Sequence, residues 1–220
     1  MAIEAVIFDM DGVIIASEKL WDDAREALVK ETGGRWGAGA QRAMMGMASH
    51  EWSAYVRDEL EVPMTAEAIN EEVVARLLKS YDEHLPLIPG AVELVTSAAE
   101  SWPLALASSS NREIIDEVLR LSGIDDYFAA AVSSEEVGRG KPAPDVFVFA
   151  AEKLSVDPSD CVVIEDSGNG IRAAVAAGMS VVAVPNEDFP PEPEALELAD
   201  VVVGTVAEIT SETIEAAASA

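Results

Sequence analysis

The sequence is poor in residues on which several kinds of site and cross-link depend. Among its 220 residues Cys161 is the only cysteine, so no internal disulfide can form, which fits a reducing compartment. The two histidines, His50 and His84, lie in unrelated sequence contexts. Zinc clusters and Ser-His-Asp triads therefore have little to be built from.

Basic residues are also scarce. The chain has 14 Lys and Arg against 41 Asp and Glu, which gives a formal net charge of -27. A field of this sign repels nucleic acid and anionic membranes, so we expect neither as a partner. It also repels phosphorylated molecules, so a substrate of that class needs positive charge at its own site. We expect most of the acidic residues to form a solvated surface.

Long apolar runs are missing as well. No run approaches the ~18 residues that cross a bilayer, and no charged segment followed by an apolar one opens the sequence. Half of the residues are nonetheless hydrophobic, which suffices for a substantial core. We therefore expect a soluble cytoplasmic protein, either a monomer or a small homo-oligomer.

The hydrophobic pattern divides the chain into two parts. Residues 17–85 show helical periodicity and no convincing strand, whereas buried-strand and helix patterns alternate after the prolyl linker 85–90. Alternating strands and helices predict an α/β fold: a Rossmann-like parallel sheet with helices on both faces. We expect this core to comprise residues 1–16 and 86–220, with a helical domain, residues 17–85, inserted after the first strand.

Several residues fit helix boundaries. We interpret Ser17 and Ser110 as helix caps, and Gly33 and Gly123 as helix ends. The last helix is expected to cover about residues 206–217.

Reactive polar residues follow three of the expected strands. Asp9 and Asp11 follow the run Val6-Ile7-Phe8; the other two strand ends carry Ser108 with Ser109 and Glu165 with Asp166. In an open α/β sheet, ligands bind outside the carboxyl ends of the strands, so these three ends can meet in one crevice. Neighbouring carboxylates repel, and Mg²⁺ would relieve that repulsion. Taken alone, Asp9 and Asp11 fit an acidic turn equally well.

The same crevice is suited to an anion. Helices that begin just after Ser110 and Gly168 would direct backbone N–H groups towards it. Lys141, in the segment Gly140-Lys141-Pro142, can supply the positive charge that the chain as a whole lacks. The combination of carboxylates, hydroxyls, N–H groups and a lysine indicates a site for Mg²⁺ and phosphate.

The sequence contains four motifs, spread over almost the whole chain, whose order resembles that of the haloacid dehalogenase-like superfamily. The resemblance is to the branch with a helical cap after the first strand. The motifs are Asp9-Met10-Asp11-Gly12-Val13, Ser108, Lys141 and Glu165-Asp166. The resemblance implies that Asp9 attacks phosphorus and forms an aspartyl-phosphate. It implies that Asp11 protonates the leaving oxygen and then activates water.

The resemblance also implies the ligands of the metal and of the phosphoryl group. Mg²⁺ would be held by Asp9, the backbone carbonyl of Asp11 and Asp166, with Glu165 bound directly or through water. Ser108 and Lys141 would hold the transferring phosphoryl group. Further candidates for phosphate or substrate binding are Gly12, Glu18, Trp21, Ser109 and Asn111.

Some of these candidates have simpler interpretations. Asn111 also fits a helix start. Trp21, together with Met45, Met47 and Trp52, fits the interior of the helical lobe better than a substrate contact.

The expected function is that of a Mg²⁺-dependent phosphatase for a small phosphorylated metabolite, a sugar phosphate in particular. A β-phosphoglucomutase-like phosphotransferase is the alternative. It is disfavoured because Trp21 stands where the mutase has a histidine, and Ser49 or His50 where it has an arginine. Two more remote alternatives are a non-catalytic phosphate-binding regulator and a dinucleotide-binding oxidoreductase. The latter rests on Gly168-Asn169-Gly170-Ile171-Arg172-Ala173, which matches a loose dinucleotide fingerprint directly behind an acidic pair.

Overall fold

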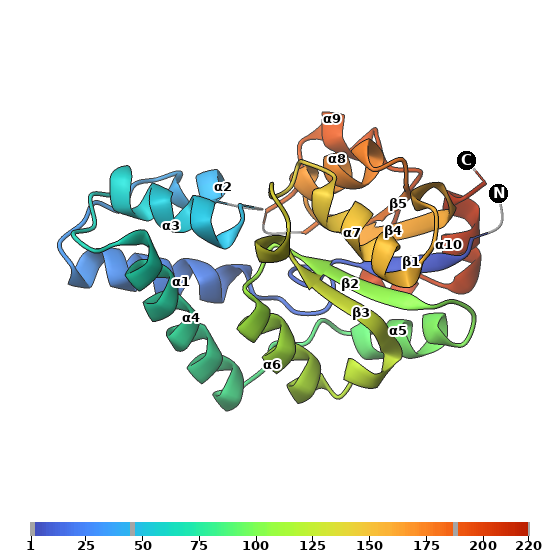
Figure 1. Cartoon of the computed structure of the whole chain (residues 1–220), viewed down its shortest axis with the longest axis horizontal. Helices are drawn as coiled ribbons and strands as arrows, with labels where there is room; N and C mark the ends of the chain where they lie inside the picture. Colours follow the sequence, from blue (N-terminus) through green and yellow to red (C-terminus); the bar gives the residue numbers. More distant parts are fainter. Residues whose placement is uncertain (1–2, 45–46, 187–188, 220) are drawn as a thin grey trace.

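The computed structural model describes residues 3–44, 47–186 and 189–219. Its centre is a six-stranded parallel sheet in the order β3-β2-β1-β4-β5-β6 (Figure 1). The strands are β1 (Ala5–Phe8), β2 (Leu104–Ser108), β3 (Phe128–Ser133), β4 (Cys161–Glu165), β5 (Ser180–Ala183) and β6 (Val201–Val202). Three of them, β1, β2 and β4, are buried along their whole length, as their uninterrupted apolar runs predict.

Helices cover both faces of the sheet because side chains alternate along each strand. Val6 and Phe8 of β1 pack in one hydrophobic cluster with α5, α6 and α10, whereas Ala5 and Ile7 pack in another with α7 and α8. The helices of this part are α5 (Ala91–Ala99), α6 (Arg112–Ser122), α7 (Asp145–Leu154), α8 (Gly168–Ala176), α9 (Pro193–Leu196) and α10 (Ser211–Ala217). The predicted α/β fold is confirmed.

A helical insert follows β1 and extends to one side of the sheet (Figure 1). It consists of α1 (Glu18–Glu31), α2 (Ala40–Met44), α3 (Ser49–Asp58) and α4 (Ala66–Glu83). Within the described part of residues 17–85 there is no strand, as predicted. Helix α4 packs against α1 and α3 in the insert and also contacts α6 of the core.

The boundaries of α6 and of the last helix differ from those predicted, and the expected side-chain cap of α1 is absent. Ser17 stands at the start of α1 without capping it, and Asn111, not Ser110, occupies the N-cap position of α6. The expected helix over residues 206–217 is interrupted: a 3₁₀ turn, Val206–Glu208, is followed by extended backbone, and α10 begins only after Thr210. The Thr210 side chain accepts from the Thr213 backbone N–H, which caps the new helix.

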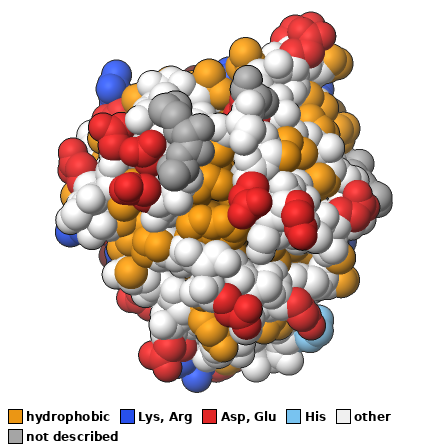
Figure 2. Space-filling view, turned by 90° about the vertical axis from the view of Figure 1, so that its right-hand side faces the viewer, with side chains coloured by type: hydrophobic (Ala, Val, Ile, Leu, Met, Phe, Trp, Pro, Cys, Tyr) orange, Lys and Arg blue, Asp and Glu red, His pale blue; other side chains and the backbone are white. Residues whose placement is uncertain are grey.

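The surface reflects the charge of the sequence. Figure 2 shows the face at the end of the core that carries both chain termini, where acidic side chains are spread among apolar ones and basic side chains are few. Among the described helices, none is long and apolar enough to cross a membrane.

Candidate functional site

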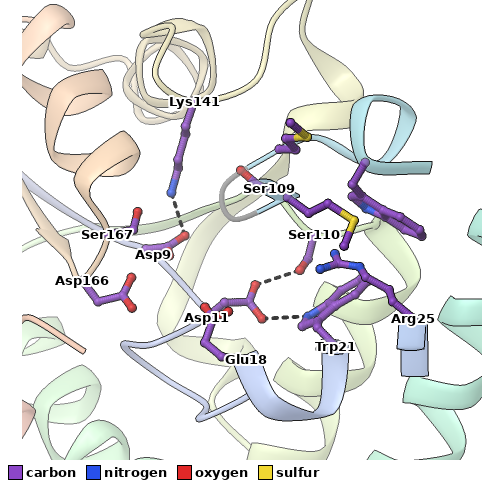
Figure 3. Close-up of a pocket in the computed structure, with 13 residues that line it drawn as sticks. Asp9, Asp11, Glu18, Trp21, Arg25, Ser109, Ser110, Lys141, Asp166 and Ser167 are labelled. Carbon is purple, nitrogen blue, oxygen red and sulfur yellow. Dashed lines mark hydrogen bonds and ion pairs between the residues drawn. The ribbon is translucent and has the colours of Figure 1, made fainter. Parts of the chain in front are cut away.

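The polar strand ends predicted from the sequence lie at one edge of the sheet. Phe8 of β1 is in register with Leu106 of β2 and Ile164 of β4, so Asp9 and Glu165 emerge side by side. A pocket opens at this edge, between the core and the helical insert (Figure 3). It is lined by Asp9, Asp11, Glu18, Trp21, Arg25, Met44, Met47, Trp52, Ser109, Ser110, Lys141, Asp166 and Ser167.

Three buried carboxylates form a cluster beneath this pocket. Oxygen atoms of Asp9, Glu165 and Asp166 all lie within 4.8 Å of one another. The Lys141 ammonium donates to Asp9 Oδ1 at 2.8 Å and to Glu165 Oε1 at 2.7 Å. Glu165 Oε2 accepts from the Ser167 backbone N–H at 2.6 Å, which leaves Glu165 less free than the other two carboxylates. Asp166 Oδ2 is buried and has no hydrogen-bond partner in the described part of the chain.

The electrostatics of the cluster favour a bound cation. Burial raises the pKa of Asp9 to about 8 although Lys141 lies beside it, because Glu165 and Asp11 oppose its ionisation. Burial, with the nearby charges of Glu165 and Asp9, also holds the pKa of Asp166 well above its ordinary value. Lys141 alone therefore does not neutralise the cluster. Three carboxylates, one with an orphaned oxygen, fit a metal ion of the hard type that oxygen ligands prefer.

Gly12 makes room for this cluster. Its φ of +86° lies in the left-handed region, and a Cβ atom at this position would stand 1.9 Å from Asp166 Oδ2. A side chain on residue 12 is therefore excluded both by the backbone conformation and by the Asp166 carboxylate.

We expect Gly12→Ala to displace Asp166 and thereby to lower the metal-dependent activity strongly. The free energy of unfolding should fall only by about the cost of the backbone strain. The backbone strain alone costs about 1–3 kcal/mol. Gly33→Ala is the matched control, since Gly33 has a similar φ of +81° and a Cβ there meets nothing within 4 Å. Metal titrations followed by activity and urea unfolding would measure the two effects. Unchanged metal dependence in Gly12→Ala would contradict this role of Gly12.

Asp11 lies on the other side of the pocket from Lys141 and accepts hydrogen bonds at both carboxylate oxygens (Figure 3). Oδ1 accepts from the Ser17 hydroxyl and from Trp21 Nε1, the latter at 3.3 Å. Oδ2 accepts from Ser110 Oγ at 2.7 Å and from Ser108 Oγ at 3.3 Å. Asp11 is thus oriented by the helical insert on one side and by the end of β2 on the other. The interpretation of Ser110 as a helix cap was wrong; Ser17 occupies the N-cap position of α1 as predicted but makes no capping hydrogen bond, and both hydroxyls donate to Asp11 instead.

The three serines at the end of β2 and just after it lie at different depths. Ser108 is fully buried and accepts from the Ser110 backbone N–H at 3.0 Å, whereas Ser109 and Ser110 line the pocket. Ser108 therefore acts on the site indirectly: its hydroxyl donates to Asp11 and accepts from the Ser110 backbone, which helps to hold the segment after β2 in place.

Asn111 lies at the contact between core and insert, outside the lining of the pocket. Its Nδ2 donates to Asn70 Oδ1 at 3.1 Å and to Glu135 Oε1 at 2.8 Å. The same Glu135 oxygen accepts from Ser49 Oγ at 2.7 Å. Because Asn70 and Ser49 belong to the insert, Asn111 and Glu135 join the two parts of the molecule beside the site.

The insert contributes Glu18, Trp21 and Trp52 to the pocket wall, together with Arg25, which sequence reasoning missed. Burial and the nearby Asp11 raise the pKa of Glu18 to about 7. Trp21 and Trp52 belong to the hydrophobic core and also line the pocket, so the two interpretations weighed for them do not exclude each other. Met47 lines the pocket as well, and Met45 lies outside the described residues.

Comparison with known proteins gives consistent matches. The family model of the haloacid dehalogenase-like hydrolases matches residues 3–178. Hexitol phosphatase B of Escherichia coli (strain K12) is 35% identical over 213 residues, which cover 94% of either chain. A phosphorylated carbohydrates phosphatase of Thermotoga maritima is 34% identical over 180 residues, 80% of this chain and 82% of the relative.

Two further matches bear on the extent of the similarity. The crystal structure of β-phosphoglucomutase from Clostridium difficile superposes with a TM-score of 0.86 at 26% identity, over 99% of this chain and 97% of the other. The bifunctional riboflavin kinase/FMN phosphatase of Arabidopsis thaliana is 32% identical over 209 residues, 94% of this chain but 54% of that relative. These matches confirm the resemblance inferred from the sequence and the prediction of a hydrolytic enzyme of the phosphatase kind.

Proposed function

The chain belongs to the haloacid dehalogenase-like hydrolases, and we propose that it is a Mg²⁺-dependent phosphatase that hydrolyses a small phosphorylated carbohydrate through an aspartyl-phosphate. The observation that carries this proposal is the position of Asp9. Its carboxylate stands at the pocket floor, is held by Lys141, and shares a cluster with Asp166, whose Oδ2 has no hydrogen-bond partner among the described residues. The substrate class is supported by the names of the relatives, which include phosphatases of hexitols and of phosphorylated carbohydrates.

In the proposed first step, an oxygen of Asp9 forms a bond to phosphorus while the bond from phosphorus to the leaving oxygen breaks. Lys141 and the N–H and hydroxyl groups of Ser109 hold the phosphoryl oxygens. Asp11 gives its proton to the leaving oxygen, which would otherwise depart as an unstable alkoxide. In the second step Asp11 takes a proton from water, the water oxygen bonds to phosphorus, and the aspartyl-phosphate bond breaks.

The metal ion would lie among Asp9, Asp166 and the backbone carbonyl of Asp11, with Glu165 bound directly or through water. When bound, Mg²⁺ supplies charge neutralisation, which reduces the repulsion between the attacking carboxylate and the phosphoryl oxygens. Residues 17–85 would act as a cap that excludes water from the pocket and determines which leaving groups the enzyme accepts.

The mutase alternative rests on the structural similarity to β-phosphoglucomutase. It requires a group that moves protons to and from a sugar hydroxyl. Trp21 instead presents an indole N–H to Asp11, and an indole N–H only donates. A bisphosphate-primed interconversion of glucose 1- and 6-phosphates faster than hydrolysis would favour the mutase over the phosphatase.

A substrate panel tests the proposed function. Hexitol, hexose and pentose phosphates and p-nitrophenyl phosphate would be assayed with Mg²⁺, and again after chelation with EDTA. We expect Mg²⁺-dependent release of phosphate from at least one carbohydrate phosphate, and none with EDTA. Absence of phosphate release across the whole panel would contradict the proposal and favour a non-catalytic phosphate-binding protein.

Metal binding should also stabilise the fold in a pH-dependent manner. In the metal-free protein the pKa of Asp9 is raised to about 8, so the folded form holds more protons than the unfolded chain and loses stability as pH rises towards that value. Bound Mg²⁺ requires ionised carboxylates. We expect Mg²⁺ to raise the unfolding midpoint by several degrees at about pH 8.5 and by little at about pH 5.5. Asp166→Asn should abolish the shift; a shift of equal size at both pH values would contradict the proposed ligands.

A further inference from the structure

Arg25 is a buried cation in the wall of the pocket. It belongs to α1, and only 9% of its surface is exposed. Its guanidinium carbon lies 4.6 Å from the ring centroid of Trp21 and 4.6 Å from that of Trp52. The two indoles are 5.9 Å apart at an angle of 68°, so Arg25 sits in the corner that they form, and its guanidinium faces the pocket (Figure 3).

Among the described residues, the guanidinium has aromatic neighbours but no hydrogen-bond acceptor. Within the part of the chain that the structure describes, no hydrogen bond or ion pair reaches Arg25, and its Nε is buried without a partner. Burial lowers the pKa of Arg25 to about 10, although Glu18 and Asp22 oppose that shift, so the group is charged at neutral pH. A buried guanidinium without an acceptor is destabilising, and an incoming oxyanion would relieve that cost.

The two basic residues in the pocket lining, Arg25 and Lys141, differ in their ion-pair partners. Lys141 is bound to Asp9 and Glu165 at the phosphoryl side. Arg25 lies beyond Asp11, the residue that the proposed function assigns to the leaving oxygen (Figure 3). It is therefore placed to meet the part of the substrate that departs.

We propose that Arg25 is a specificity-determining residue that binds a carboxylate on the leaving group, so that the preferred substrates are phosphate esters of hydroxy acids such as phosphorylated sugar acids. This inference rests on the proposed phosphatase function. A carboxylate matches the planar fork of the guanidinium and brings a single negative charge. A second phosphate would bring up to two charges close to Asp11 and Glu18, with one cation to balance them.

Two matched pairs of substrates test the proposal, since the members of each pair differ only in whether a carboxylate replaces a hydroxymethyl group. They are D-3-phosphoglycerate with D-glycerol 3-phosphate (sn-glycerol 1-phosphate), and 6-phosphogluconate with sorbitol 6-phosphate. We expect kcat/KM to favour the carboxylated member of at least one pair by about 10- to 100-fold. A ratio near one in both pairs would overturn the proposal.

Arg25→Met should bring that ratio close to one, because the charge and the donors are lost while most of the side-chain volume remains. Arg25→Lys should restore part of the preference, since it keeps the charge without the fork. Arg57→Met is the charge-matched control: Arg57 lies on α3, is paired with Asp58, and is outside the pocket lining, so the wild-type ratio should persist. A ratio that stays at its wild-type value in Arg25→Met would show that Arg25 only stabilises the insert, and overturn the proposal.

Binding separates failure of this inference from failure of the proposed function. Trp21 and Trp52 touch Arg25, so ligand binding to Asp9→Asn can be followed by tryptophan fluorescence without turnover. We expect the carboxylated member of the preferred pair to bind more tightly, and Arg25→Met in the Asp9→Asn background to remove the difference. Hydrolysis by the wild type without a preference for the carboxylated member would overturn only the proposed role of Arg25. A preference for that member in binding, without hydrolysis by the wild type, would overturn only the proposed phosphatase function. The same binding measurement can compare fructose 1,6-bisphosphate with fructose 6-phosphate. If the bisphosphate is preferred by a larger factor than the carboxylated member of either pair, Arg25 would bind a second phosphate instead.

Discussion

Replacement of Asp9 by asparagine is expected to lower kcat for every phosphoester by at least about 10³-fold, because the amide oxygen is a poor nucleophile. The change is nearly isosteric, and the asparagine oxygen can still accept from Lys141, which donates to Asp9 Oδ1 at 2.8 Å in the wild type. Asparagine is neutral at every pH, so the variant also lacks the ionised form of residue 9, which burial and the neighbouring Glu165 disfavour. We therefore expect the variant to fold with unchanged or greater stability.

The control for Asp9→Asn is a substitution that removes a carboxylate from outside the cluster. Asp157→Asn serves this purpose, since the Asp157 carboxylate is engaged with Ser159 at the turn before β4. Steady-state kinetics and thermal unfolding would be measured for both variants. Retention of a tenth or more of the wild-type kcat by Asp9→Asn would contradict the assignment of Asp9 as the nucleophile.

Replacement of Asp11 by asparagine should produce a different pattern, in which the loss depends on the leaving group. For alkyl phosphates we expect kcat to fall by about 10²–10⁴-fold, because the leaving oxygen no longer receives a proton. For p-nitrophenyl phosphate the first step should survive, since nitrophenolate departs without protonation, whereas the second step lacks its base. Stopped-flow kinetics should therefore show a burst of nitrophenol equal to the enzyme concentration, followed by slow turnover.

The surroundings of Asp11 make this variant interpretable. Trp21 only donates a hydrogen bond, whereas the hydroxyls of Ser108 and Ser110 can also accept. The asparagine amide should therefore turn its NH₂ group towards the serines and keep its oxygen towards Trp21, so the side chain stays in place. Equal losses for alkyl and nitrophenyl phosphates, with no burst, would contradict a role of Asp11 as the acid of the first step.

The strand ends of the site could be predicted from the sequence because their signal is local. An apolar run that stops at an aspartate or serine marks the end of a buried strand, and parallel strands place such ends at one edge. The register of Phe8 with Ile164 then makes Asp9 and Glu165 neighbours, although they are far apart in the chain. Lys141 could be included only because an anion site needs positive charge and because of the order of motifs, since nothing local shows that its loop reaches Asp9.

The residues that the sequence analysis misassigned or missed have local sequence patterns that are compatible with more than one tertiary contact. A serine before a helix satisfies the capping pattern whether its hydroxyl turns to the helix or, as with Ser110, to Asp11, which lies 99 residues earlier in the chain. Arg25 follows Trp21 by one helical turn, which is visible in the sequence. Its burial depends on Trp52 from α3, however, and no local pattern indicates that contact.

The central claim is that Asp9 carries the phosphoryl group between the two steps, and reductive trapping tests it most directly. Borohydride reduces an aspartyl-phosphate to homoserine and leaves a free carboxylate unchanged. The enzyme would be mixed with substrate and Mg²⁺, quenched with borohydride, digested and analysed by mass spectrometry. We expect homoserine at position 9 only when substrate and Mg²⁺ are both present, with more of it in Asp11→Asn when p-nitrophenyl phosphate is the substrate. Rapid hydrolysis with an unmodified Asp9, or homoserine at another aspartate, would contradict the account.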